Sequence, residues 1–151
     1  MGYTHYYYQT RDFTDTEWNV MRTAFDILVD QTDIPLANWE GENQPECDDK
    51  GMSFNGVAPE EDHESFVIDR KMGDQPGHRR DEEDIFHFCK TAEKPYDEAV
   101  IGMLLVACWI APAVFRIGSD GCMDGEEWHA GRILSQKVIS EINIMEFNYG
   151  G

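Results

Sequence analysis

The sequence predicts a single α+β domain spanning residues 1–151, in which about five strands form a mixed or antiparallel sheet covered by about three helices. Two observations predict this class. The chain has 151 residues, of which 41% are hydrophobic, and this is enough for one core but not for two domains. Short segments suited to strands also alternate with longer segments of helical spacing, in the order strand, helix, three strands, helix, strand, helix.

The N-terminal segment Tyr3–Gln9 predicts the first strand. It is dense in aromatic residues and threonine, which favour strands. The period of two places Tyr6 and Tyr8 on one face, and on the other Tyr3, His5 and Tyr7. Both faces therefore need either burial in the core or a ligand stacked on the rings.

The first helix follows at once. Thr14 and Glu17 form a capping box, and apolar residues recur at helical spacing as far as about Asp30. Residues 31–50 contain two prolines and scattered acids without periodicity, which predicts a long surface loop.

Two strands are predicted next, Met52–Val57 and Ser65–Arg70, joined by an acidic turn. Asn55 and Gly56 indicate a bulge or a tight bend at the end of the first of them. The polar segment Lys71–Asp84, which contains two glycines and a proline, is predicted to be a second loop.

The centre of the chain predicts a short strand and the most buried helix. Ile85, Phe86, Phe88 and Cys89 form an apolar run too short for a helix. Pro95 suits the first position of the following helix, which makes Lys94 its expected N-cap. The apolar run Ala99–Ile110 has about 12 residues, fewer than the ~18 needed to span a bilayer, so a core helix is expected and no membrane segment.

The C-terminal part predicts one more strand and one more helix. Pro112 ends the central helix, and Ala113–Ile117 forms a short strand. A turn with Ser119 and Asp120 then leads to a last helix that begins near Asp124. Its apolar face is expected to carry Trp128, Leu134, Val138, Ile142 and Met145.

Charge excludes two classes of partner. The formal net charge of −18 argues against direct nucleic-acid binding and against binding to an anionic membrane, because both depend on basic surface. Residues 66–94 differ from the rest, with six bases against seven acids. These residues are therefore the one part of the chain that an anion could approach. Four widely spaced cysteines and the lack of a signal-peptide pattern predict a cytoplasmic protein with reduced thiols.

The predicted N-terminus of the central helix is the first candidate site. Lysine is a poor N-cap, because its charge adds to the positive end of the helix dipole. Either Asp97 and Glu98 of the first turn compensate this charge, or an anion does so, held by Lys90, Thr91 and Lys94. The loop lacks the glycines of a nucleotide-binding phosphate loop.

Other motifs give weaker signals. A calcium loop after Asp120 is excluded because its third and twelfth positions are Cys122 and Gly131. His87 and Cys89 share a strand face, which fits a packed pair better than a zinc site, so no metal and no cofactor are predicted. His63 is flanked by carboxylates that are expected to raise its pKa. No known order of Ser, His and Asp in hydrolases is present.

Several blocks of the chain carry a resemblance. The opening MGYTHYYY, the segments FNG and DHESF, the block FHFCKTAEKPYD and the later SDG resemble a family of small phage and prophage proteins that start MGYTHYW and contain FCKTARKPYD and SSDG. This chain departs from the family at Tyr7, Glu93 and Gly118. The resemblance implies a shared fold, a phage or prophage origin and hence the host cytosol. It implies no reaction.

The blocks place candidate ligand-binding residues at strand ends and turns, with Tyr7 added from the first strand: His5, Tyr7, Asn55, His63, Lys90, Thr91, Lys94, Tyr96, Asp97, Ser119 and Asp120. The expected function is binding of a small phosphate-bearing, nucleotide-like ligand without evident catalysis, such as a host immune signal. One alternative is an acidic decoy that binds a host DNA-binding or defence protein. A third is a phosphodiester-cleaving enzyme with His63 or His87 as general base.

Overall fold

A three-stranded antiparallel sheet lies at the centre of the fold. The computed structural model describes residues 4–71, 85–119 and 126–140. Strand β1 (Thr4–Gln9) lies between β5 (Ile85–Lys90) and β6 (Phe115–Ser119) and pairs antiparallel with both. Strands β5 and β6 are therefore parallel to each other, and the connection between them crosses over as a split β-α-β unit.

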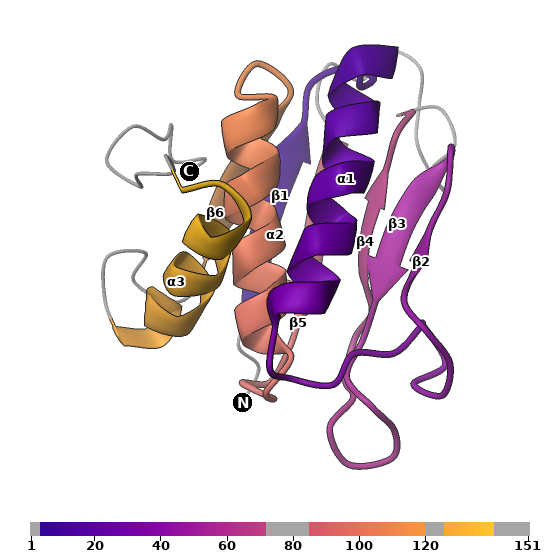
Figure 1. The fold of residues 1–151 in the computed structure, drawn as a ribbon, viewed down its shortest axis with the longest axis vertical. Coiled ribbons are helices and arrows are strands. Elements are labelled where there is room, and N and C mark those ends of the chain that lie inside the picture. Colours follow the sequence, from indigo (N-terminus) through magenta and orange to yellow (C-terminus); the bar gives the residue numbers. More distant parts are fainter. Residues whose placement is uncertain (1–3, 72–84, 120–125, 141–151) are drawn as a thin grey trace.

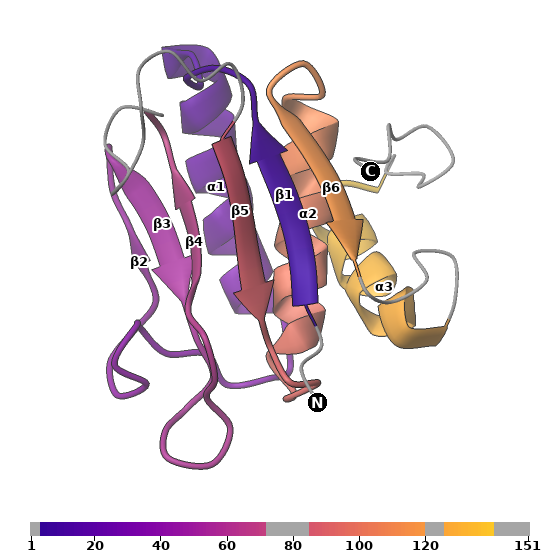
Figure 2. The ribbon, with the colours of Figure 1, turned by 180° about the vertical axis from the view of Figure 1, so that it is seen from behind.

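Helices cover one face of this sheet, and none of the helices among the residues just given lies on the other face (Figures 1 and 2). Helices α1 (Asp15–Gln31) and α2 (Asp97–Ile110) lie on the sheet, and α3 (His129–Val138) packs against α2. A short 3-10 helix, η2 (Glu126–Trp128), precedes α3. One side of the central sheet is consequently the core and the other side faces outward.

A second antiparallel sheet extends the layer beyond β5. Its order is β2-β3-β4, with β2 at Glu46–Cys47, β3 at Gly51–Phe54 and β4 at Phe66–Asp69. Strand β4 runs beside β5 (Figure 2). The backbone N–H of Glu64 donates to the carbonyl of Lys90 at 3.2 Å, so the segment before β4 is joined to the end of β5.

The core centres on α2. Its residues from Ala99 to Cys108 are all buried, as its unbroken apolar run predicts. Buried rings from the neighbouring elements surround it, among them Trp18, Phe54, Phe66, Tyr96, Phe115 and Trp128. The two sheets and three α-helices formed by the described residues confirm the predicted α+β class.

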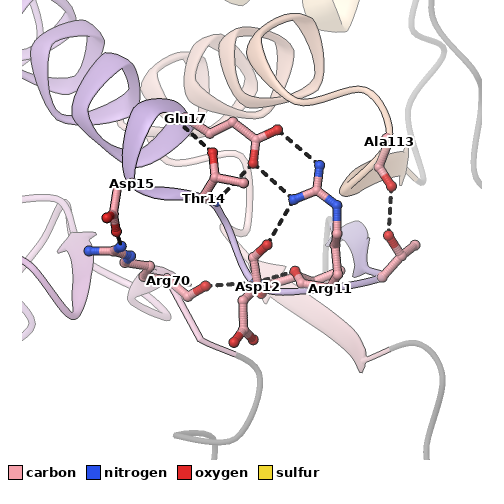
Figure 3. A network of polar contacts seen from close by, with 9 residues as sticks. Arg11, Asp12, Thr14, Asp15, Glu17, Arg70 and Ala113 are labelled. Atoms are coloured by element: carbon pink, nitrogen blue, oxygen red, sulfur yellow. Dashed lines mark hydrogen bonds and ion pairs between the residues drawn. The ribbon is translucent and has the colours of Figure 1, made fainter.

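The start of α1 is held by polar contacts at the end of the sheet where β1 finishes (Figure 3). The predicted capping box is present: the Glu17 N–H donates to the Thr14 hydroxyl at 3.1 Å, and the Thr14 N–H donates to Glu17 Oε1 at 2.9 Å. The Arg11 guanidinium donates to both carboxylate oxygens of Glu17 and lowers the pKa of that carboxyl. Arg70, just after β4, forms an ion pair with Asp15 and so ties β4 to α1.

Several predicted boundaries are wrong by a few residues. Helix α2 begins at Asp97 rather than Pro95, and its N-cap is Tyr96, with helical backbone angles and no side-chain cap, rather than Lys94. The residues before it form turns in which Ala92 and Glu93 have positive φ angles of 53° and 57°. The predicted loop 31–50 contains β2, because Glu46 and Cys47 pair with β3.

The last helix also differs from its prediction. Helix α3 ends at Val138, whereas the apolar spacing predicted a helix to about Met145. Asp124, Ile142 and Met145 lie outside the described residues. Among the described residues, no helix has both the length and the apolar character needed to cross a bilayer.

Candidate functional site

Many of the predicted site residues gather at one end of the central sheet. Because β1 is antiparallel to both neighbours, its first residues lie beside the last residues of β5 and β6. Helix α2 also begins at this end, six residues after β5 stops. The residues brought together there are His5, Lys90, Thr91, Tyr96, Asp97 and Ser119.

A buried hydrogen-bonded cluster, consisting of His5, Thr91, Asp97, Ser119 and Trp128, joins these elements. His5 Nε2 lies 2.6 Å from Asp97 Oδ1, and His5 Nδ1 lies 2.8 Å from Ser119 Oγ. The Thr91 hydroxyl donates to the same Asp97 oxygen at 2.5 Å. The Trp128 indole N–H donates to Ser119 Oγ at 3.3 Å, and its ring meets that of His5 edge to face.

The contact with Asp97 assigns one hydrogen position of His5. A carboxylate can only accept, so Nε2 carries the proton and donates to Asp97. Nδ1 forms the second hydrogen bond of the ring, with the Ser119 hydroxyl. The His5 ring is completely buried, and both its nitrogens are hydrogen-bonded. The cluster joins four segments of the chain: β1, the segment from Thr91 to the start of α2, the end of β6, and η2. The two contacts of His5 join residues 114 and 92 positions apart in the sequence, so no motif spacing could indicate them.

The predicted anion-binding groups make contacts within the protein. Lys94 Nζ donates to the carbonyl of Glu60 at 2.7 Å, and the Thr91 hydroxyl is used by Asp97. At the start of α2, the N–H of Asp97 donates to the carbonyl of Lys94 at 2.9 Å. Lys90 instead places its ammonium group over the Phe88 ring, 5.8 Å from the ring centre. The lysines therefore contact different partners.

Asn55 and His63 belong to a turn that closes over the end of β5. The Asn55 side chain accepts from the His63 N–H at 3.0 Å and donates to the His63 carbonyl at 2.9 Å. His63 Nδ1 lies 2.6 Å from the carbonyl of Lys90. The buried Tyr96 hydroxyl donates to the carbonyl of Glu64 at 2.6 Å, and burial raises the Tyr96 pKa. These residues position the end of β5.

Tyr7 lies away from this end, in the middle of the helix-covered face. Its ring stacks on His87 with ring centres 5.0 Å apart, and its hydroxyl donates to the carbonyl of Val67 at 2.5 Å. Burial raises the pKa of Tyr7. Tyr7 is therefore part of the core contact between β1 and β4. Asp120, the remaining predicted residue, lies outside the described residues.

The outward face of the sheet carries aromatic residues that sequence reasoning did not select as a site. We call this surface the aromatic face; it consists of Tyr6, Tyr8, Phe86, Phe88, Lys90 and Arg116. Phe86 is 49% exposed and Phe88 is 50% exposed, although both belong to a strand beside the core. In the described parts of the chain, no helix lies on this side of the sheet (Figure 2).

Strand register arranges the aromatic face in cross-strand rows. Tyr8 lies opposite Phe86 on β5 and opposite Arg116 on β6. In the next row, Tyr6 lies opposite Phe88 and Gly118, and Gly118 contributes no side chain. The Arg116 guanidinium lies 5.5 Å from the centre of the Tyr8 ring. Arg116 thus ends the first row on β6, and Lys90 of β5, opposite Thr4, lies beyond the second row at the other end of the face.

A local signal for this face exists in the sequence. In IFHFCK, Phe86 and Phe88 are two positions apart, so they share a face opposite His87 and Cys89. The alternation that predicts a shared face for His87 and Cys89 therefore also predicts that Phe86 and Phe88 share the opposite face. His87 and Cys89 lie on the inward side, where the His87 ring stacks on Tyr7; burial lowers the pKa of His87 to about 4 and raises the pKa of the Cys89 thiol.

Among the described residues, no three His, Cys, Asp or Glu side chains gather closely enough to hold a metal ion. Compared with family models, curated proteins and solved structures, the chain has no match. The fold and its contacts define a class, an α+β domain whose central sheet has one face covered by helices and one aromatic face bordered by two cations.

Proposed function

We propose that the protein binds a small phosphate-bearing, nucleotide-like ligand on the aromatic face without turning it over. A base stacks on the rings of β1 and β5, and Lys90 and Arg116 attract the phosphate. The observation that carries this proposal is the combination of two half-exposed phenylalanines with a cation at each end of the same sheet face, Arg116 beside Tyr8 and Lys90 beside Phe88.

Stacking is the chemistry that such a surface offers. Nucleobases stack on exposed aromatic side chains of antiparallel sheets, and each stacked base is worth about 1–3 kcal/mol. The cations are matched to a phosphate, and a purely apolar partner would gain nothing from them. In a chain of net charge −18, two cations on one sheet face are a local exception to the surrounding potential.

The buried cluster around His5 supports the same surface from beneath. It fixes Thr91, the residue that follows Lys90, through the bond between Thr91 and Asp97. The N–H of Lys90 also donates to Glu64 Oε1 at 2.8 Å. The backbone that carries Lys90 is thus held on both sides, which limits the entropy lost when a ligand binds.

The resemblance to phage and prophage proteins suggests a biological use for such binding. A phage protein that holds a nucleotide signal of the host without degrading it would lower the free concentration of that signal. Sequestration of a host immune messenger in the host cytosol is the use that we propose.

Thermal unfolding in the presence of mononucleotides, dinucleotides and cyclic oligonucleotides tests the binding proposal. A ligand that binds only the folded state, present at 100 times its Kd, adds about 2.7 kcal/mol of stability and raises Tm by about 5–10 °C in a chain of this size. Phe88→Ala should remove most of this shift. Trp39→Ala, which truncates a 63% exposed ring on another part of the chain, should leave it unchanged.

Two other results would reject the proposal. The net charge of −18 favours the alternative of an acidic decoy. No shift with any nucleotide, together with salt-sensitive binding to a purified host DNA-binding protein, would establish that alternative. A concentration-dependent dimer that Phe88→Ala dissociates would show instead that a second copy of the chain covers the aromatic face.

A further inference from the structure

We infer that the aromatic face takes two bases at once, so that its ligand is a dinucleotide, linear or cyclic, rather than a mononucleotide or a long strand. This inference rests on the proposed function and specifies the ligand class. It is based on the repetition of the rows: Tyr8 with Phe86, then Tyr6 with Phe88.

The spacing of the rows separates two bases from each other. Residues two positions apart on a strand lie about 6.8 Å apart, because each residue advances about 3.4 Å. Successive nucleotides in a stacked strand are only about 3.4 Å apart. Two bases on neighbouring rows are therefore unstacked from each other, and each one contacts its own pair of rings. The phosphate linkage between them is then extended along the strands.

The ring contacts join both rows through Phe86 into one surface long enough for two bases. Phe86 has ring contacts to Tyr6 at 5.9 Å and to Tyr8 at 5.2 Å, so the two rows form one continuous surface. Phe88 lies 6.0 Å from Phe86 and is covered on one side by Lys90. Gly118 adds no side chain beside Tyr6. The second base has room on this side of the row.

Charge limits the number of phosphates. The two cations of the face compensate one or two phosphate charges, which is what a dinucleotide carries. Each further nucleotide adds a negative charge within the field of a chain of net charge −18. A long strand therefore gains stacking only at these two rows while its repulsion grows with length.

Calorimetric titration with adenine ligands of different length tests the inference on the full chain. The probes are adenosine monophosphate, the linear and cyclic adenine dinucleotides, and hexa-adenylate. Either dinucleotide is expected to bind at least tenfold more tightly than the mononucleotide, because a second base is stacked. Hexa-adenylate offers several pairs of neighbouring nucleotides, each of which can occupy the face. Its affinity divided by the number of these pairs should be no higher than the affinity of the linear dinucleotide.

Variants of the two rows separate the sites. Phe86→Ala and Phe88→Ala should each weaken dinucleotide binding about tenfold and change mononucleotide binding about twofold, since the other row remains. Trp39→Ala is the matched control and should change neither. The melting temperatures of the free variants should stay close together, because both phenylalanines are half exposed.

The possible outcomes are distinct. Equal affinity for mononucleotide and dinucleotide, with only one of the two variants weakening it, would overturn the two-base inference and leave the proposed function intact. A rise in affinity per register with strand length would overturn it in favour of a polymer. If none of the probes binds, the proposed function itself fails.

Discussion

At the residue scale, the His5 cluster shows how a polar group is accommodated in the core. A buried imidazole is tolerated when both nitrogens are hydrogen-bonded, and here Asp97 and Ser119 provide the two partners. Asp97 accepts from two donors with one oxygen, so it is the residue on which the other contacts depend. The cluster therefore matters for stability whether or not a ligand is present.

Substitution of Asp97 should distinguish a lost acceptor from a lost charge. Asp97→Ala leaves His5 Nε2 and the Thr91 hydroxyl without their acceptor and should lower the free energy of unfolding by about 2–5 kcal/mol. Asp97→Asn retains an accepting oxygen and should lower it by about 1 kcal/mol, part of which reflects the helix dipole. Urea unfolding measures both. Equal losses in the two variants would contradict the hydrogen-bonding account.

His87 predicts a dependence of stability on pH. Burial lowers its pKa from 6.5 to about 4, and its Nε2 is buried without a hydrogen-bond partner. As pH falls below 6.5, the unfolded chain binds a proton at this site and the folded chain does not, so stability falls between pH 6.5 and 4. Because His87 is partly exposed, solvent screening reduces the expected loss to about 1–2 kcal/mol.

The matched variant for this test is His87→Phe, which keeps a ring against Tyr7. The difference in unfolding free energy between the two proteins should change by about 1–2 kcal/mol in favour of the variant between pH 7 and pH 4. The other titrating groups are present in both proteins and cancel in the comparison. Parallel pH profiles would show that His87 does not carry this effect.

At the element scale, local patterns predicted most of the fold. The capping box of α1, the two faces of β1 and the buried run of α2 depend only on neighbouring residues, and the structure confirms them. The predicted start of α2 was wrong because Ala92 and Glu93 adopt positive φ angles in the preceding turns, a conformation that alanine and glutamate rarely adopt and that the sequence therefore did not indicate. The contacts between the candidate site residues join distant strands and could not be derived from spacing.

The packing of α3 on α2 gives a test at this scale. A Cβ added at Gly131 would lie 2.3 Å from Ile101 Cγ2 and 2.5 Å from Ile101 Cβ, so the helices would have to separate. Gly131→Ala should therefore destabilise the protein by about 1–3 kcal/mol, although alanine favours helices. Ala130→Gly, the reverse exchange at an exposed neighbour, should also destabilise, by about 1 kcal/mol. A more stable Gly131→Ala variant would contradict this packing.

The central helix provides a second comparison. Leu104 is completely buried in α2, so Leu104→Ala should cost about 2–5 kcal/mol through lost burial and the remaining cavity. Ile133 on α3 is 42% exposed, and Ile133→Ala should cost less than about 1 kcal/mol. Chemical unfolding of both variants measures the difference. Similar losses at the two positions would mean that α2 is not the centre of the core.

At the scale of the whole molecule, asymmetry between two faces of one sheet connects fold and function. Helices cover the face of the sheet on which His5, Tyr7 and Phe115 are buried, whereas Phe86 and Phe88 on the opposite face are half exposed. The negative charge of the chain acts on any anion that approaches, whereas Lys90 and Arg116 act only at short range. These two ranges of electrostatic interaction respond differently to salt.

Salt dependence should therefore separate the two leading functions. For a ligand with two phosphates, loss of the local attraction would give a slope of log K against log salt of at most about −1.4. Salt also screens the repulsion from the net charge of −18, since the Debye length falls from about 30 Å at 0.01 M to about 8 Å at 0.15 M, and this raises affinity. The observed slope should thus be shallower than about −1.

An acidic decoy bound to a basic protein makes many charge contacts and would show a slope several times steeper. Titrations of a dinucleotide and of a purified host DNA-binding protein between 10 and 300 mM salt, with uncharged adenosine as the salt-independent control, measure both slopes. A steep slope for the protein partner, with no measurable nucleotide binding at any salt concentration, would assign the chain to the decoy class.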